Sequence, residues 1–91
     1  MSVEVYISVI LREACGGKSL FQLEADTVSA IIDAINSDYP GFRQHVLTED
    51  DGVREGVRVS INGEDVAALS GVGTRLRPGD HVFLLVGIAG G

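Results

Sequence analysis

The stretch HVFLLVGIAGG, residues 81–91, joins an apolar run to a segment that closes on two glycines. Residues 82–86 are apolar at every position, a pattern typical of a strand in the centre of a sheet. Residues 87–91 then carry side chains only at Ile88 and Ala89. Because glycine lacks a Cβ, such a segment can extend into a narrow channel. We therefore expect a buried strand that leads into a slender tail.

The beginning of the chain predicts a second strand that could pair with this one. Apolar residues alternate with other residues at Val3, Val5, Ile7, Val9 and Leu11. Gly16 and Gly17 suit a turn, and residues 19–24 form a returning strand, so residues 3–24 are predicted to make a β-hairpin. If the last strand lies beside the first, the two run parallel at the centre of the sheet.

One amphipathic helix is predicted between these strands. Its apolar stripe follows the spacing i, i+3, i+4 and i+7 at Val28, Ile31, Ile32 and Ile35. Asp26 or Thr27 can cap its N-terminus, and Pro40 stops it after Tyr39. Residues 41–47 predict a further helical turn.

The remaining segments predict loops and one more strand. Residues 48–56 are polar and suit a surface loop, whereas residues 57–61 alternate again, with Val57, Val59 and Ile61 facing inward. Asn62-Gly63 indicates a tight turn, residues 64–74 short irregular structure, and residues 77–80 a turn. With one long helix to cover one sheet face, we expect an α+β, single-domain β-grasp fold of about four to five strands. Residues 1–91 would form the domain, with 87–91 as a flexible reactive tail.

Charge and hydropathy limit the classes of partner. Thirteen acidic residues against seven basic ones give a net charge of −6, which argues against nucleic acid and favours positively charged protein surfaces. Acidity that only maintains solubility is the alternative. No apolar run is long enough to cross a bilayer, and the first residues alternate like a strand, unlike a signal peptide. The lone Cys15 fits a reducing compartment, so we expect a soluble, cytoplasmic protein.

Most side chains that could carry chemistry lack the neighbours they would need. His45 and His81 have no metal-ligand spacing, and no metal site is expected. Cys15 has no adjacent base in the sequence, so it is predicted to be an inert thiol. The remaining candidate is the α-carboxylate of Gly91. Transfer of AMP to a carboxylate creates a good leaving group, after which a sulfur nucleophile can attack the carbonyl carbon.

Four segments carry a resemblance to a known family: ILREACGGK (10–18), YPGFRQHVL (39–47), VSINGEDVAALSGVGTRLRPGDHVFLL (59–85) and AGG (89–91). Nearly the whole chain resembles ubiquitin-like sulfur carriers of the ThiS/MoaD family, closest to the CysO-type branch. The resemblance implies a protein cosubstrate with no bound cofactor and no catalytic residue of its own. A ubiquitin-activating-like adenylyltransferase/sulfurtransferase would use ATP to adenylate Gly91. The resulting thiocarboxylate would pass its sulfur to a client enzyme.

The resemblance also implies roles for the tail. Gly91 matches the position that bears adenylate and sulfur, and the tail that partner enzymes recognise matches Gly90, Ala89, Ile88 and Gly87. A metalloprotease that trims or releases the tail is a further implied partner. Gly87 stands where members of this branch often have proline, which bears on the fit to a partner. The last strand supplies a docking face on one parity, either Phe83 with Leu85 or Val82 with Leu84 and Val86.

Alternatives remain open at this stage. Cysteine biosynthesis is the favoured client pathway, with molybdopterin, thiamin and specialised metabolites as the others. The same activated terminus could instead form isopeptide bonds, as in a ubiquitin-like modifier, although Lys18 is the only lysine through which chains could grow. A passive binding module with an incidental diglycine is the third possibility.

Overall fold

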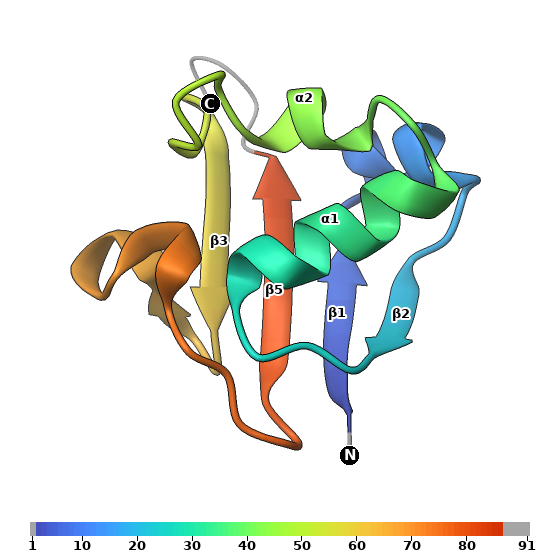
Figure 1. Ribbon diagram of the computed structural model, residues 1–91. Helices are drawn as coiled ribbons and strands as arrows, with labels where there is room; N and C mark the ends of the chain where they lie inside the picture. Colours follow the sequence, from blue (N-terminus) through green and yellow to red (C-terminus); the bar gives the residue numbers. More distant parts are fainter. Residues whose placement is uncertain (1, 87–91) are drawn as a thin grey trace.

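The computed structural model describes residues 2–86, which form one mixed sheet with a helix across one face (Figure 1). The sheet has five strands in the order β2-β1-β5-β3-β4. Their bounds are Val3–Ile7 (β1), Leu20–Leu23 (β2), Val57–Ile61 (β3), Glu64–Asp65 (β4) and His81–Val86 (β5). The β-grasp fold predicted from the sequence is confirmed.

Strand β5 occupies the centre of the sheet. It runs parallel to β1, with Tyr6 opposite Phe83, and antiparallel to β3, with Val59 opposite Leu84. Because both edges of β5 are paired and one face lies under the helix, the side chain of Leu84 is fully buried. The first and last strands are parallel neighbours, which is the arrangement expected if the last strand lies beside the first.

Helix α1, Val28–Asp38, covers the inner face of the sheet. Thr27 is its N-cap, and the Oγ1 of Thr27 accepts a hydrogen bond of 3.1 Å from the backbone N–H of Ala30. The predicted apolar stripe is confirmed, with every member in the core: Val28, Ile31, Ile32 and Ile35. Pro40 follows the C-cap residue, Tyr39, in agreement with the predicted stop.

The predicted hairpin is correct in its pairing but wrong in the length of its first strand. Strand β1 ends at Ile7, and Val9–Cys15 form a 3₁₀ helix, η1, before the chain returns as β2. Leu11 turns into the core, whereas Val9 is 70% exposed. Strand β2 has only four residues. A first strand that continued to Leu11, as predicted, would therefore have no β2 residues to pair with beyond Ile7. A compact 3₁₀ segment buries Leu11 and satisfies its backbone N–H, which donates to Ser8 O at 3.0 Å.

Gly16 ends η1 in the left-handed region, with φ of 69°. A Cβ at this position would lie 2.7 Å from Cε1 of Tyr39. The position therefore requires glycine both for its backbone angle and for the close approach of the tyrosine ring.

The second half of the chain follows the predicted order. Helix α2, Phe42–Val46, is the expected helical turn, and residues 48–56 form a largely exposed loop. Asn62 and Gly63 have φ of 52° and 90°, as the predicted tight turn between β3 and β4 requires. Residues 64–74 were predicted to be irregular, but Glu64 and Asp65 form the short strand β4, which pairs with β3. The rest of that segment contains two short 3₁₀ helices, Val66–Ala68 (η2) and Gly71–Gly73 (η3).

Candidate functional site

The C-terminal end of β5 is held on both sides. Val86 pairs with Val57 of β3, and its backbone N–H donates to the Oγ of Ser8 at 3.2 Å. The N–H of Ser8 in turn donates to Leu84 O at 3.0 Å. The strand is thus fixed up to its last residue. Gly87, Ile88, Ala89, Gly90 and Gly91 lie outside the described residues, so the flexible reactive tail stays a prediction.

The two parities of β5 differ in exposure. Val82 and Leu84 are both 0% exposed beneath α1, so they are core residues. Leu85 is 39% exposed and Phe83 is half-buried on the opposite face of the sheet. Val86 is half-buried at the end of the strand. Of the two docking sets proposed from the sequence, Phe83 with Leu85 is therefore the outward one.

Figure 1 shows α1 and α2 on the same side of the sheet, and no helix among residues 2–86 covers the other side. We call that side the open face. Cross-strand partners share a face, so the register assigns to the open face the side chains of Tyr6, Leu20, Phe83 and Leu85, together with Glu4, Gln22, Arg58, Ser60 and His81.

Tyr6 lies on the open face in β1, next to the central strand β5. Its ring stacks on that of Phe83, with centroids 4.7 Å apart and planes 12° apart, and on His81 at 5.8 Å and 15°. Tyr6 and Leu20 were not predicted as site residues from the sequence. The available signal was an aromatic and an aliphatic side chain at outward positions of two predicted strands, where polar residues are more usual.

A hydrogen-bonded carboxylate borders this apolar surface. The hydroxyl of Tyr6 donates to Glu4 Oε1 at 2.9 Å, and Gln22 Nε2 donates to Glu4 Oε2 at 3.3 Å. Both hydrogen bonds lower the pKa of Glu4, and the bond from Tyr6 has the larger effect. The bond between Tyr6 and Glu4 also raises the pKa of Tyr6. His81 Nδ1 lies 3.3 Å from Glu4 Oε1. Glu4 is therefore a fixed negative charge at one margin, while Arg58 pairs with Asp65 at 3.5 Å at the other.

Cys15 lies apart from the open face, inside the core. The side chain is 0% exposed, and its Sγ lies 3.6 Å from the carbonyl oxygens of both Leu11 and Lys18, which share its single S–H donor. Burial raises the pKa of the thiol, which opposes formation of the nucleophilic thiolate. These surroundings agree with the inert thiol predicted from the sequence.

Neither a metal-binding cluster nor a membrane-spanning helix is found among residues 2–86. Residues 2–86 contain no group of three or more His, Cys, Asp or Glu side chains placed to hold a metal ion. None of the helices in that part of the chain is long and apolar enough to cross a membrane. His45 is exposed on α2.

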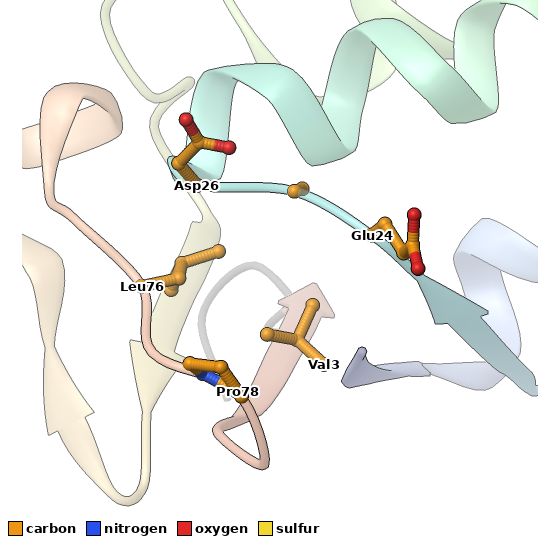
Figure 2. Close-up of a pocket in the computed structure, with 6 residues that line it drawn as sticks. Val3, Glu24, Asp26, Leu76 and Pro78 are labelled. Atoms are coloured by element: carbon orange, nitrogen blue, oxygen red, sulfur yellow. The ribbon is translucent and has the colours of Figure 1, made fainter. Parts of the chain in front are cut away.

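A shallow pocket of about 600 Å³ lies at the end of the sheet where β1 and β5 begin, away from Val86. Val3 and Leu76 point toward one another across it, whereas the carboxylates of Glu24 and Asp26 point away from them (Figure 2). Its lining contains no thiol, hydroxyl or imidazole side chain. The pocket is therefore separate from the surface at the end of β5.

The chain matches a known protein family over most of its length. The ThiS family profile matches residues 5–91. The chain is 31% identical over 93 residues to the sulfur carrier protein CysO of Mycobacterium tuberculosis, with 100% of both chains covered. It is 32% identical over 93 residues to small archaeal modifier protein 3 of Haloferax volcanii, again with 100% coverage of each.

A solved structure gives the same result in three dimensions. A chain of the BexX/CysO complex of Amycolatopsis orientalis superimposes with a TM-score of 0.89 at 31% identity, covering 98% of this chain and 99% of that one. By name, the two curated relatives are a sulfur carrier protein and a small archaeal modifier protein. Since the family profile spans nearly the whole sequence and the relatives match it from end to end, the chain belongs to the ThiS family.

Proposed function

We propose that this protein is a sulfur carrier and that the carboxylate of Gly91 bears the sulfur. The observation that carries the proposal is the full-length match to the sulfur carrier CysO, within a family profile that includes Gly90 and Gly91. The central position of β5 supports it, because residues 87–91 then follow a strand that is held rigidly up to Val86. The protein acts as a cosubstrate of partner enzymes.

The chemistry balances in two steps. A carboxylate oxygen of Gly91 attacks the α-phosphorus of ATP, pyrophosphate leaves, and an acyl-adenylate forms. A sulfur nucleophile at the oxidation level of sulfide then attacks the carbonyl carbon, AMP leaves with the C–O bond electrons, and a thiocarboxylate remains. Residues 87–91, whose only side chains are those of Ile88 and Ala89, would thread into the active site of the activating enzyme.

We further propose that an enzyme of cysteine biosynthesis accepts this sulfur and that a metalloprotease trims or releases the tail. Similarity to CysO along the whole chain supports this client over molybdopterin, thiamin or specialised metabolites. We place the protein in the cytoplasm, where ATP for the activation step is available.

Docking of these enzymes is assigned to the open face. Phe83 and Leu85 project from the strand that leads to the tail, and Tyr6 extends the same apolar surface through its ring stack with Phe83. Apolar surface exposed in this way usually marks an interaction site. A partner seated there would receive residues 87–91 from a fixed direction.

The test is incubation of the protein with ATP, its activating enzyme and a sulfide donor, followed by a thiol-selective alkylating probe. The expected result is one probe adduct on the peptide that contains Gly91, formed only when ATP is present. A variant with one alanine added after Gly91 should form no adduct, because an amide replaces the reactive carboxylate. Loading of that extended variant, without prior trimming to Gly91, contradicts the proposal.

Cys15→Ser is the matched control for the probe. The buried thiol is expected to play no part in loading, so this variant should acquire the ATP-dependent adduct at nearly the wild-type rate. Loss of loading by folded Cys15→Ser would assign the sulfur chemistry to Cys15 and not to Gly91.

A second candidate function is conjugation of Gly91 to lysine side chains of target proteins. The observation that favours it is the 32% identity to small archaeal modifier protein 3 over 100% of both chains. The two functions differ in the acceptor, since a modifier yields isopeptide-linked conjugates that survive thiol and reductant treatment. Mass spectrometry of such conjugates for a lysine joined to Gly91 separates a modifier from a carrier.

A further inference from the structure

Two adjacent aliphatic side chains stand out on the surface. Among the large hydrophobic residues of the described chain, Val9 at 70% and Ile10 at 57% have the greatest exposed fractions. Single exposed aliphatic residues are common, whereas adjacent ones add up to contiguous apolar surface, which marks an interaction site when it is large. We call these two residues the η1 patch.

The η1 patch is held rigidly. Leu11 and Cys15, on the same 3₁₀ helix, are buried at 3% and 0% exposure. The N–H of Gly17 donates to Arg12 O at 2.7 Å, and Arg12 Nε donates to Ile7 O at 3.0 Å. The exposure of Val9 and Ile10 is therefore a fixed feature of the fold, and docking against them would order no further backbone.

The patch adjoins the end of β5. Ser8 directly precedes Val9 and bonds to that strand twice, to Leu84 O at 3.0 Å and from the N–H of Val86 at 3.2 Å. Since Ile7 lies opposite Leu84 in the parallel register, Ser8 lies beside Leu85, which is itself 39% exposed. The η1 patch thus begins one residue after Ser8, at the same end of β5 as Leu85.

The length of chain after Val86 limits what can cover this surface. Five residues follow Val86, and even fully extended they reach at most about 18 Å. An enzyme that acts on Gly91 must therefore approach the end of the domain where Val86, Leu85 and the η1 patch lie. This step rests on the proposed function, because that function makes Gly91 the reacting residue.

Charge indicates the chemistry of the occupant. Glu13 of η1 is exposed beside the patch, and Glu55 is exposed two residues before Val57, the β3 partner of Val86. Arg12 precedes Glu13 and Arg54 precedes Glu55, so it is the net charge of −6 of the chain that favours an apolar partner surface bordered by cationic side chains.

We propose that Val9 and Ile10, which lie at the same end of the sheet as Val86, are an anchor for the enzyme that adenylates Gly91. The enzyme would cover them with an apolar surface whose margin carries Arg or Lys. The role is positioning only, since no atom of either side chain takes part in the transfer of AMP.

The double variant V9S/I10S tests the anchor. Both side chains are exposed, so thermal unfolding of the variant should match the wild type. In ATP–pyrophosphate exchange with the activating enzyme from the same genome, its KM for the carrier should rise about tenfold or more, with kcat at saturation unchanged. The swap V9I/I10V keeps the apolar surface and should keep the wild-type KM.

Leu69→Ser is the matched control. Leu69 is 41% exposed and caps η2, which follows β4. The chain enters β4 from Ile61, the β3 residue that pairs with Val82, whereas Val57 at the other end of β3 pairs with Val86. Its loss should leave KM unchanged. An unchanged KM for folded V9S/I10S, or an equal rise for Leu69→Ser, would overturn the anchor.

Direct binding separates this inference from the proposed function. If the wild-type protein supports no exchange, the proposed function fails. The anchor is still decided by calorimetric titration of the activating enzyme without ATP. There, a Kd weakened about tenfold by V9S/I10S supports the anchor, and an unchanged Kd or no binding of the wild type refutes it.

Discussion

Tyr6 connects the apolar and polar parts of the open face through two kinds of contact. Its ring stacks on Phe83 at 4.7 Å, and its hydroxyl donates to Glu4 at 2.9 Å. The alternation of β1 predicts that Tyr6 points outward. The identity of its neighbours depends on the register with β2 and β5, which local sequence does not specify. The sequence thus predicted the face on which a single site residue lies, but not the residues that it contacts.

Tyr6→Phe should raise the pKa of Glu4, because the hydroxyl is the foremost group that stabilises the carboxylate. A carboxyl whose pKa is lowered in the folded state contributes stability above its unfolded pKa, about 4.3 for Glu. That contribution is lost as the pH falls through the lower folded value. The wild type should therefore exceed Tyr6→Phe in stability at neutral pH, with the gap closing in acid.

NMR titration of the Glu4 carboxyl and urea unfolding at neutral and acidic pH provide the measurement. Gln22→Leu is a graded control, since Gln22 makes the weaker bond of 3.3 Å to Glu4 and should produce a smaller rise. Identical Glu4 titration in wild type and Tyr6→Phe would show that the hydroxyl does not stabilise this carboxylate.

At the scale of elements, the segment after Ile7 shows where periodicity misleads. Val9 and Leu11 continue the period of two, and a 3₁₀ helix nevertheless replaces the strand because β2 provides only four residues for pairing. Helix α1 was predictable at both ends, since a cap at Thr27 and a stop at Pro40 are local signals. The end of a strand depends instead on the strand that it pairs with. The end of β1 was therefore predicted less well than the ends of α1.

Ile31 and Ile32 are neighbours in α1, and sequence spacing alone suggests that they cannot be equally buried. Both are nevertheless 0% exposed. Helix α2 packs on one flank of α1 and the η3 segment packs against α1 as well, where Val28 N–H donates to Thr74 O at 3.3 Å. The helix is therefore enclosed over a wider arc than a sheet alone would cover.

Ile31→Ala and Ile32→Ala should each lower the free energy of unfolding by about 2–4 kcal/mol through lost burial and a cavity. Urea denaturation measures the change, with Ser37→Ala, exposed on the same helix, expected to stay within about 0.5 kcal/mol of wild type. A neutral result for both isoleucine variants is incompatible with this packing.

For the whole molecule, the presence of one uncovered sheet face followed from counting elements, whereas the place of the last strand beside the first was only a conditional expectation, which the structure confirms. One long helix covers one face, so the other face had to remain open. The outward parity of β5 could not be chosen from HVFLLV, because both parities are apolar and only the position of α1 distinguishes them. The η1 helix was not predicted, since Val9 and Leu11 continue the alternation of the strand and residues 14–18 were assigned to the turn.

Leu85→Asp should leave the fold intact and weaken docking of the partner enzymes. The new carboxylate would lie opposite Arg58, its β3 partner, which favours the substituted strand pair. Adenylation at subsaturating carrier should fall by about tenfold or more, whereas Leu69→Asp, at a similarly exposed position, should behave as wild type. Wild-type adenylation of folded Leu85→Asp would remove the open face from the docking surface.

The central place of β5 has a consequence for biosynthesis. β5 is made last among the strands, yet it alone joins the β2-β1 pair to the β3-β4 pair. A nascent chain that lacks residues 81–86 has two separate strand pairs, and two-stranded units are at best marginally stable. The domain should therefore fold only after β5 has left the ribosome. Incomplete translation products would stay unfolded and open to proteolysis, so they would not compete with the mature carrier for its enzymes.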